Sequence, residues 1–158
     1  MQKVKVSLFI FVLIILLAPF GFAAGERSFK AILSGSEVVP PVKTIANGEA
    51  VFQLSKDGKE VAYKLTVSDI ENVTAVHIHD GKFGVNGPPI VNLFTGPKKK
   101  GKFFGTLSEG TITEKDLMGQ LNGKPFSNFI DMIQDGLTYV NVHTDKYPDG
   151  EIRGQIKP

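Results

Sequence analysis

The chain has three histidines, and they lie in two short segments, "AVHIHD" and "LTYVNVHTD". Side chains alternate between the two faces of a strand, so Val76 and Ile78 face one side of the first segment while His77 and His79 face the other. The two histidine positions are about 6.6 Å apart along a strand. Imidazole nitrogens bind copper or zinc at about 2.0 Å, so this spacing allows both rings to reach one ion.

The third histidine has the same setting as the first two. Val140 and Val142 form the apolar face of its segment, which leaves Tyr139, Asn141 and His143 on the polar face. If the two strands are neighbours, all three histidines share one face. Three imidazoles leave a coordination position open, as at catalytic metal sites. The sequence therefore predicts a mononuclear copper or zinc site formed by the three histidines.

Polar residues near the histidines are candidates for orienting the imidazole rings. A turn at Pro148-Asp149-Gly150 is expected to return the chain as a hairpin, with Glu151 and Arg153 on the polar face. Hydrogen bonds from such residues orient metal-bound imidazoles. The candidate supporting residues are Asn141, Glu151 and Arg153, and Tyr139 is expected on the same face as Arg153. A surface ion pair between Glu151 and Arg153 is the alternative.

A structural role for the histidines is also left open by the sequence. In this alternative they are hydrogen-bonded residues that tie loops to the sheet. Asp80 and Asp145 lie close to histidines and are further candidates for a carboxylate ligand, although their spacing fixes neither. The loop "DGKFGVNGPP" after His79 lacks the helix and the Gly-Lys-Ser/Thr ending of a phosphate-binding loop. It is interpreted as a sharp turn with Phe83 packed over it.

The elements that must position these residues are short strands. Apolar and polar residues alternate in "SFKAIL", "EAVFQLS" and "EVAYKLTV", and Asp57-Gly58 predicts a tight hairpin between the last two. Further strands are expected at "AVHIHD", "IVNLF", "KFFGTL", "LTYVNVHT" and "GEIRGQI". The segment "SNFIDMIQDG" predicts one short helix between Ser127 as N-cap and Gly136 as stop, and "PKKKGK" is interpreted as a solvated turn. About eight strands predict an all-β antiparallel sandwich or barrel.

Composition limits the class of protein further. Residues 1–24 have lysines, an unbroken apolar run and a small-residue exit, which predicts a cleaved signal peptide followed by a single domain over 25–158. Loss of Lys3 and Lys5 brings the basic count from 18 to 16, equal to the 16 acidic residues. This balance argues against nucleic acid as a partner. The mature chain is expected to have no membrane span and to be secreted, periplasmic or held in the cell envelope.

Three ordered motifs resemble the chordin-type CHRD domain family. They are "GSEVVPPVKTIANGEAVFQLSKDGKEVAYKLTV", "VHIHDGKFGVNGPPIVNLF" and "YVNVHTDKYPDGEIRGQI". The resemblance covers residues 28–157 and implies a β-sandwich with an immunoglobulin-like or Greek-key plan. In chordin such domains belong to an extracellular antagonist of growth factors. The cysteine-rich modules that bind growth factor there are missing here, so the resemblance does not extend to that function.

A second resemblance is to the copper/zinc superoxide dismutases, which place a His-x-His pair on a strand of a Greek-key barrel before a glycine-rich loop. His77 and His79 match that pair, and His143 matches a later ligand. The chain has no bridging histidine with a zinc sub-site, and its lack of cysteine rules out the disulfide. These departures disfavour dismutase activity more than they disfavour copper binding.

Two functions remain open at this point. One is a secreted metal-binding protein, in which any enzymatic activity depends on the metal, because no serine or cysteine nucleophile motif and no paired-carboxylate site is found. The other is a non-catalytic extracellular or envelope module that binds a protein or a polysaccharide. Metal content separates the two hypotheses.

Overall fold

The structure, a computed structural model, describes residues 27–158, so the predicted signal peptide lies outside the described residues. The described chain forms seven strands, one α-helix and three 3₁₀ helices. The strands are β1 (Ser28–Ser34), β2 (Asn47–Leu54), β3 (Glu60–Asp80), β4 (Pro89–Phe94), β5 (Lys99–Thr113), β6 (Thr138–Thr144) and β7 (Ile152–Gln155). The helices are α1 (Phe126–Gln134) and the 3₁₀ helices Gly35–Glu37, Glu114–Asp116 and Gly119–Leu121.

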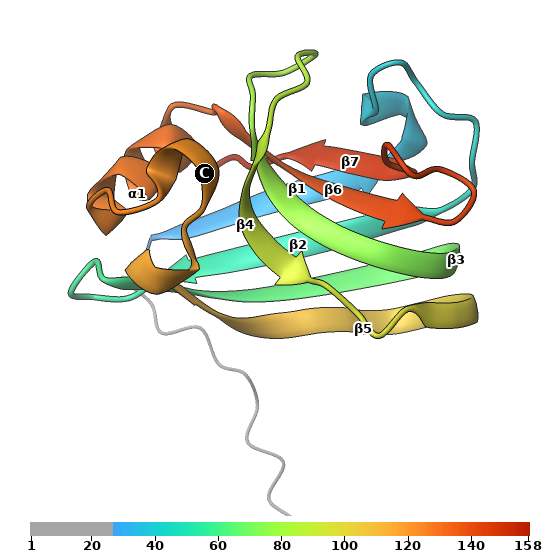
Figure 1. Cartoon of the computed structure of the whole chain (residues 1–158), viewed down its shortest axis with the longest axis horizontal. Helices are drawn as coiled ribbons and strands as arrows, with labels where there is room; N and C mark the ends of the chain where they lie inside the picture. The colour runs from blue at the N-terminus through green and yellow to red at the C-terminus, as the bar shows by residue number, and fades with distance from the viewer. Residues whose placement is uncertain (1–26) are drawn as a thin grey trace, which may run out of the picture.

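Five of the strands close into an antiparallel barrel. The order β2-β1-β7-β6-β3 is closed by pairing between β2 and β3. The remaining strands, β4 and β5, pair with β3 outside this circuit (Figure 1). The predicted all-β antiparallel class is therefore confirmed. The Greek-key, immunoglobulin-like plan implied by the family resemblance stays a prediction.

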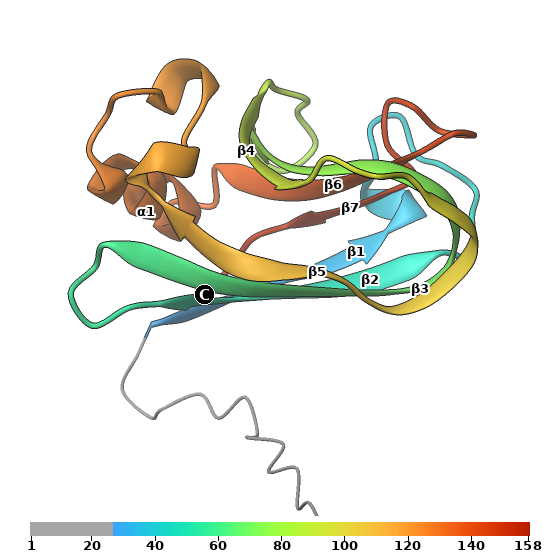
Figure 2. The ribbon, with the colours of Figure 1, turned by 60° about the horizontal axis from the view of Figure 1, so that its bottom comes forward.

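The long strand β3 connects the two sides of the barrel. Its first half pairs with β2 and β5, and its second half pairs with β6 and β4. Figure 2 shows the strand turning at one end of the barrel. Asp69 and Asn72 lie at this turn with φ of 54° and 53°, and the pairing register with β5 shifts at each of them.

The prediction of eight strands was wrong by one because of this turn. The segments "EVAYKLTV" and "AVHIHD" were counted as separate strands, but both belong to β3. The polar residues between them indicated a break, whereas the backbone continues through bulges there. The interpretation of "PKKKGK" as a turn also needs correction, because Lys99 to Lys102 form the start of β5 and pair with Val73 and Glu71 of β3.

Helix α1 closes one end of the barrel with its apolar face (Figures 1 and 2). Phe129 and Ile133 are fully buried in the core cluster. The predicted N-cap Ser127 was wrong: the helix begins at Phe126, whose backbone N–H donates to the Glu114 carboxylate at 3.3 Å. The predicted stop is confirmed, since Gly136 follows the helix with a φ of 66°, a conformation that favours glycine.

The predicted hairpin at Asp57-Gly58 is also confirmed. Residues of β2 pair with β3 from Leu54 opposite Val61 onward, and Gly58 has a φ of 73° in the turn. The core lies inside the barrel and includes Val76 and Ile78, both with no exposed surface. The intervening histidines of β3 therefore face away from the core.

Candidate metal centre

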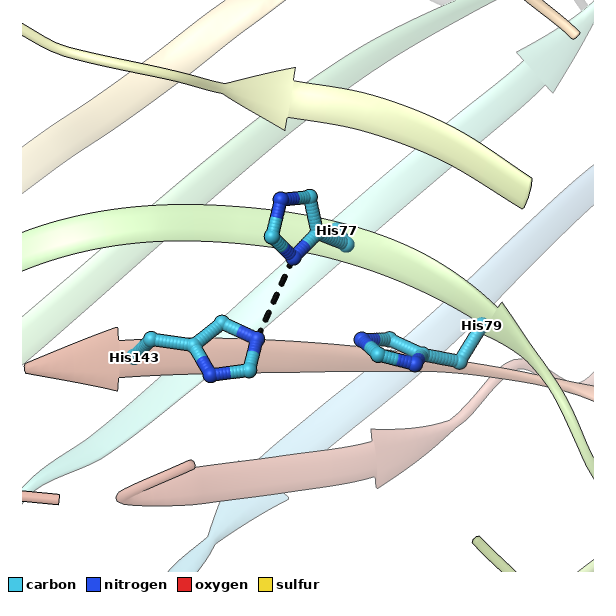
Figure 3. A group of neighbouring side chains, drawn as sticks. All are labelled: His77, His79 and His143. Atoms are coloured by element: carbon cyan, nitrogen blue, oxygen red, sulfur yellow. Dashed lines mark hydrogen bonds between the residues drawn. The ribbon is translucent and has the colours of Figure 1, made fainter. Parts of the chain in front are cut away.

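The three histidines converge on one point outside the barrel core. Strand β3 pairs with β6 so that His77 lies opposite Asn141 and His79 lies opposite Tyr139, while His143 lies opposite Ala75. One ring nitrogen from each histidine lies within 4.8 Å of the others. Figure 3 shows the three rings standing over the two strands with nitrogens directed toward one another.

Hydrogen bonds to backbone carbonyls fix the orientation of two rings. His79 Nδ1 donates to the Gly87 carbonyl at 2.8 Å, and His143 Nδ1 donates to the Pro148 carbonyl at 2.8 Å. A carbonyl only accepts, so both Nδ1 atoms must be protonated. In the neutral rings the lone pair therefore lies on Nε2. Metal-bound histidines commonly show the same arrangement, in which the nitrogen that does not bind the metal donates to a carbonyl or carboxylate.

His77 completes the group with Nδ1, whereas His143 contributes Nε2. Its Nδ1 lies 3.2 Å from His143 Nε2 (Figure 3). Since His143 Nε2 is an acceptor, His77 Nδ1 donates in the metal-free protein. His77 Nδ1 therefore carries a proton in the metal-free protein, and it would have to lose this proton before its lone pair could bind a metal. Moving that proton to Nε2 converts His77 into a ligand without changing its charge.

His79 Nε2 is a buried nitrogen that lacks a hydrogen-bond partner within the described residues. The His79 side chain is 9% exposed. A buried acceptor without a partner costs about 1–3 kcal/mol. A histidine that only tied a loop to the sheet would not need this atom directed toward two other imidazoles.

A stack of side chains holds His79 in place. Its ring lies parallel to that of Tyr139, with centroids 4.9 Å apart and planes 12° apart. The Arg153 guanidinium carbon lies 3.5 Å from the centroid of the same tyrosine ring. Arg153 also donates to Asn86 Oδ1 at 3.0 Å and to the Val85 carbonyl at 3.0 Å. Tyr139 and Arg153 thus lie together on the polar face and connect it to the 81–88 loop.

The 81–88 loop needs glycine at the position that anchors His79. A Cβ on Gly87 would lie 1.8 Å from the Asp80 carbonyl oxygen, so the backbone would have to move. Gly87 also contacts Tyr139, whose hydroxyl accepts from its N–H at 3.1 Å. The sharp turn predicted for this loop therefore serves to place a carbonyl against His79.

We expect Gly87→Ala to weaken zinc binding about tenfold or more, because loss of an outer partner of a ligand histidine costs about 10- to 100-fold in metal affinity. Calorimetric titration measures the change. Gly84→Ala is the matched control, since a Cβ there meets nothing within 4 Å although its φ is 75°. Equal affinity of the Gly87→Ala variant and the wild type would contradict the anchoring role.

Burial and mutual proximity keep the imidazoles neutral. The pKa of His77 is lowered to about 4, mainly by burial and then by the neighbouring His143 and His79. Burial likewise lowers the pKa of His79 and of His143, with the backbone hydrogen bonds acting in the opposite direction. Neutral imidazole is the form that a metal ion would require, and lowered pKa values favour that form at neutral pH.

Zinc binding at pH 6.5 should therefore release few protons. Three histidines with an ordinary pKa of about 6.5 would be half protonated and would release about 1.5 protons. The lowered pKa values mean that the folded protein holds fewer of these protons at pH 6.5, so we expect a release below about one. Calorimetry in buffers of different ionisation enthalpy gives the number. A release near about 1.5 would contradict the lowered pKa values.

The other predicted residues have different roles. Asn141 Nδ2 donates to the Asp149 carbonyl at 3.0 Å, so this side chain holds the β6–β7 turn. Glu151 accepts from Thr44 Oγ1 at 2.7 Å and from Thr144 Oγ1 at 2.8 Å, which directs its carboxylate away from the histidines. Within residues 27–158 no ion pair joins Glu151 to Arg153.

The two aspartates considered as extra ligands bond elsewhere. Asp80 accepts from Gln120 Nε2 at 2.6 Å, and Asp145 pairs with Lys98 at 2.7 Å. Phe83, expected to pack over its loop, is 66% exposed. Sequence reasoning missed the carbonyl anchors Gly87 and Pro148, although the glycine-rich loop and the Pro-Asp-Gly turn beside the histidines were visible clues.

Comparison with known proteins identifies the family. A family model for the CHRD domain matches residues 29–156, nearly the whole described chain. The chain belongs to the CHRD domain family. The predicted family is thus confirmed, and the three histidines of this CHRD domain lie inside the matched region. No curated protein and no solved structure matches the chain, so the resemblance to superoxide dismutases stays a prediction.

Proposed function

We propose that this CHRD domain binds one copper or zinc ion through His77 Nδ1, His79 Nε2 and His143 Nε2. The observation that carries the proposal is the buried, unpartnered Nε2 of His79, which belongs to a group of three ring nitrogens lying within 4.8 Å of one another. The two carbonyl anchors support it, because they place the lone pairs of His79 and His143 on Nε2, the nitrogen that would bind an ion.

One distance in the group already suits a first-row transition metal. Two ligands at about 2.05 Å in a tetrahedral site are about 3.3 Å apart. The separation of His77 Nδ1 and His143 Nε2 is 3.2 Å, so this pair needs little movement. The group contains neither thiolate nor carboxylate, and imidazole ligands suit copper and zinc better than calcium or magnesium.

The proposal includes export of the protein. The apolar run and small-residue exit of residues 1–24 support a cleaved signal peptide, and the equal numbers of acidic and basic residues in 25–158 support a role other than nucleic-acid binding. Within residues 27–158 no helix is long and apolar enough to cross a membrane. We propose a secreted, periplasmic or envelope location.

Titration of the purified, metal-stripped chain 25–158 with zinc and with copper tests the proposal, together with elemental analysis of the protein as isolated. We expect saturation at one ion per chain. Magnesium is the control ion, because it prefers oxygen ligands. Absence of saturable binding by both ions would overturn the metal proposal. The alternative would then be a non-catalytic module that binds a protein or a polysaccharide.

A further inference from the structure

We infer that the metal centre, once loaded, binds a small anion from solution at its remaining coordination position. The inference rests on the proposed function and adds a class of ligand to it. Its basis is the number and charge of the protein ligands, the engagement of the nearby carboxylates, and the exposure of one side of the site.

The protein supplies three ligands and no negative charge. Each histidine of the group offers one ligand atom. A divalent ion held by three neutral imidazoles retains its full charge of two. Zinc and copper sites of this kind fill a further position with water or an exogenous ligand. Since a bound cation is the largest local charge in such a site, an anion is favoured over a neutral ligand.

Nearby carboxylates and carbonyls of the described chain have other partners. Asp80 and Asp145 are bonded to Gln120 and Lys98, and Glu151 is bonded to two threonines. The Gly87 and Pro148 carbonyls accept from the ligand histidines themselves. Each of these groups already accepts at least one hydrogen bond or ion pair, which holds it in its present position.

Asp149 is the remaining carboxylate that influences the group. It lies on the β6–β7 turn, where its charge offsets part of the lowering of the His143 pKa by burial. It is exposed and lies outside the set of groups whose ligand atoms converge. Its charge opposes an anion, whereas the guanidinium of Arg153 behind Tyr139 favours one. Removal of the Asp149 charge is therefore expected to strengthen anion binding.

The remaining position faces outward. The histidines project from β3 and β6 on the face opposite the core, so the strands lie behind the three rings (Figure 3). His79 is buried beneath the 81–88 loop, but His77 and His143 are only partly buried. A ligand opposite the sheet therefore has a path from solvent on the side of these two residues.

Azide binding to the copper(II)-loaded protein tests the inference. Copper stoichiometry is measured first on the same sample, and sodium azide is then titrated while absorbance and electron paramagnetic resonance are recorded. Sodium perchlorate at matched ionic strength is the control, because it coordinates weakly. We expect a new azide-to-copper charge-transfer band that saturates at one azide per copper.

The variant Asp149→Asn distinguishes an open coordination position from one that Asp149 fills. With an open position, azide binds the wild type, and the variant binds it a few-fold more tightly because a negative charge is removed. If azide binds the variant but not the wild type, Asp149 fills the position and the inference is overturned. If copper is bound and azide changes neither protein, the inference fails while the proposed function stands. If copper is not bound, the proposed function itself fails.

Discussion

Replacing His77 and His79 by alanine should abolish stoichiometric binding of copper and zinc. The change removes two of the three convergent nitrogens and leaves His143 with its Pro148 contact alone. A single imidazole cannot hold an ion against water, so affinity should fall by at least about a thousandfold, corresponding to about 4 kcal/mol. Calorimetric titration of the double variant measures this loss directly.

The fold of that variant should survive. Both histidines lie outside the hydrophobic core cluster, and their neighbours Val76 and Ile78 are unchanged. The matched control is Thr66→Ala/Thr106→Ala, an exposed cross-strand pair between β3 and β5 away from the site. Far-ultraviolet circular dichroism should show β-structure in both variants. Unchanged metal affinity in the histidine variant would show that His77 and His79 are not the metal ligands.

Metal binding should also raise the thermal stability of the wild type strongly. An ion that binds only the folded chain at a free concentration of about 100 times Kd adds about 2.7 kcal/mol. For a domain of this size, this amounts to a rise in Tm of about 10 °C. The ligands come from strands β3 and β6, which are far apart in sequence, so the unfolded chain does not reproduce the site.

Calorimetric scans with and without zinc measure this rise. Magnesium and the His77→Ala/His79→Ala variant are the controls, and both should leave Tm unchanged. A similar rise with zinc in the variant would mean that the ion stabilises the fold from another position. No rise in the wild type at saturating zinc would contradict selective binding to the folded state.

Local patterns in the sequence were sufficient for most of the fold. Alternation placed Val76, Ile78, Val140 and Val142 correctly in the core, and the Asp-Gly turn placed the β2–β3 hairpin. Alternation could not show that β3 continues past Asp69, because the bulges there are stabilised by pairing with β5, a contact distant in sequence. The helix start was missed for the same reason, since its cap comes from Glu114.

For the candidate site too, local patterns predicted some features and contacts distant in sequence determined the others. Residue types and alternation identified the three histidines and their shared face, but only the pairing of β3 with β6 brings them together. Arg153 was expected beside the histidines and reaches them through the ring of Tyr139. Glu151 was misplaced because strand β7 begins only at Ile152, so the alternation of side chains along β7 does not extend to Glu151.

A crystal structure of the zinc-loaded protein, with anomalous difference density recorded at the zinc edge, would show whether the three histidines hold the ion. We expect one peak bonded at about 2.0–2.1 Å to His77 Nδ1, His79 Nε2 and His143 Nε2. We also expect the Nδ1 contacts of His79 and His143 to Gly87 and Pro148 to persist. A peak bound elsewhere, with the three imidazoles unchanged and His77 still bonded to His143, would contradict the proposed metal site.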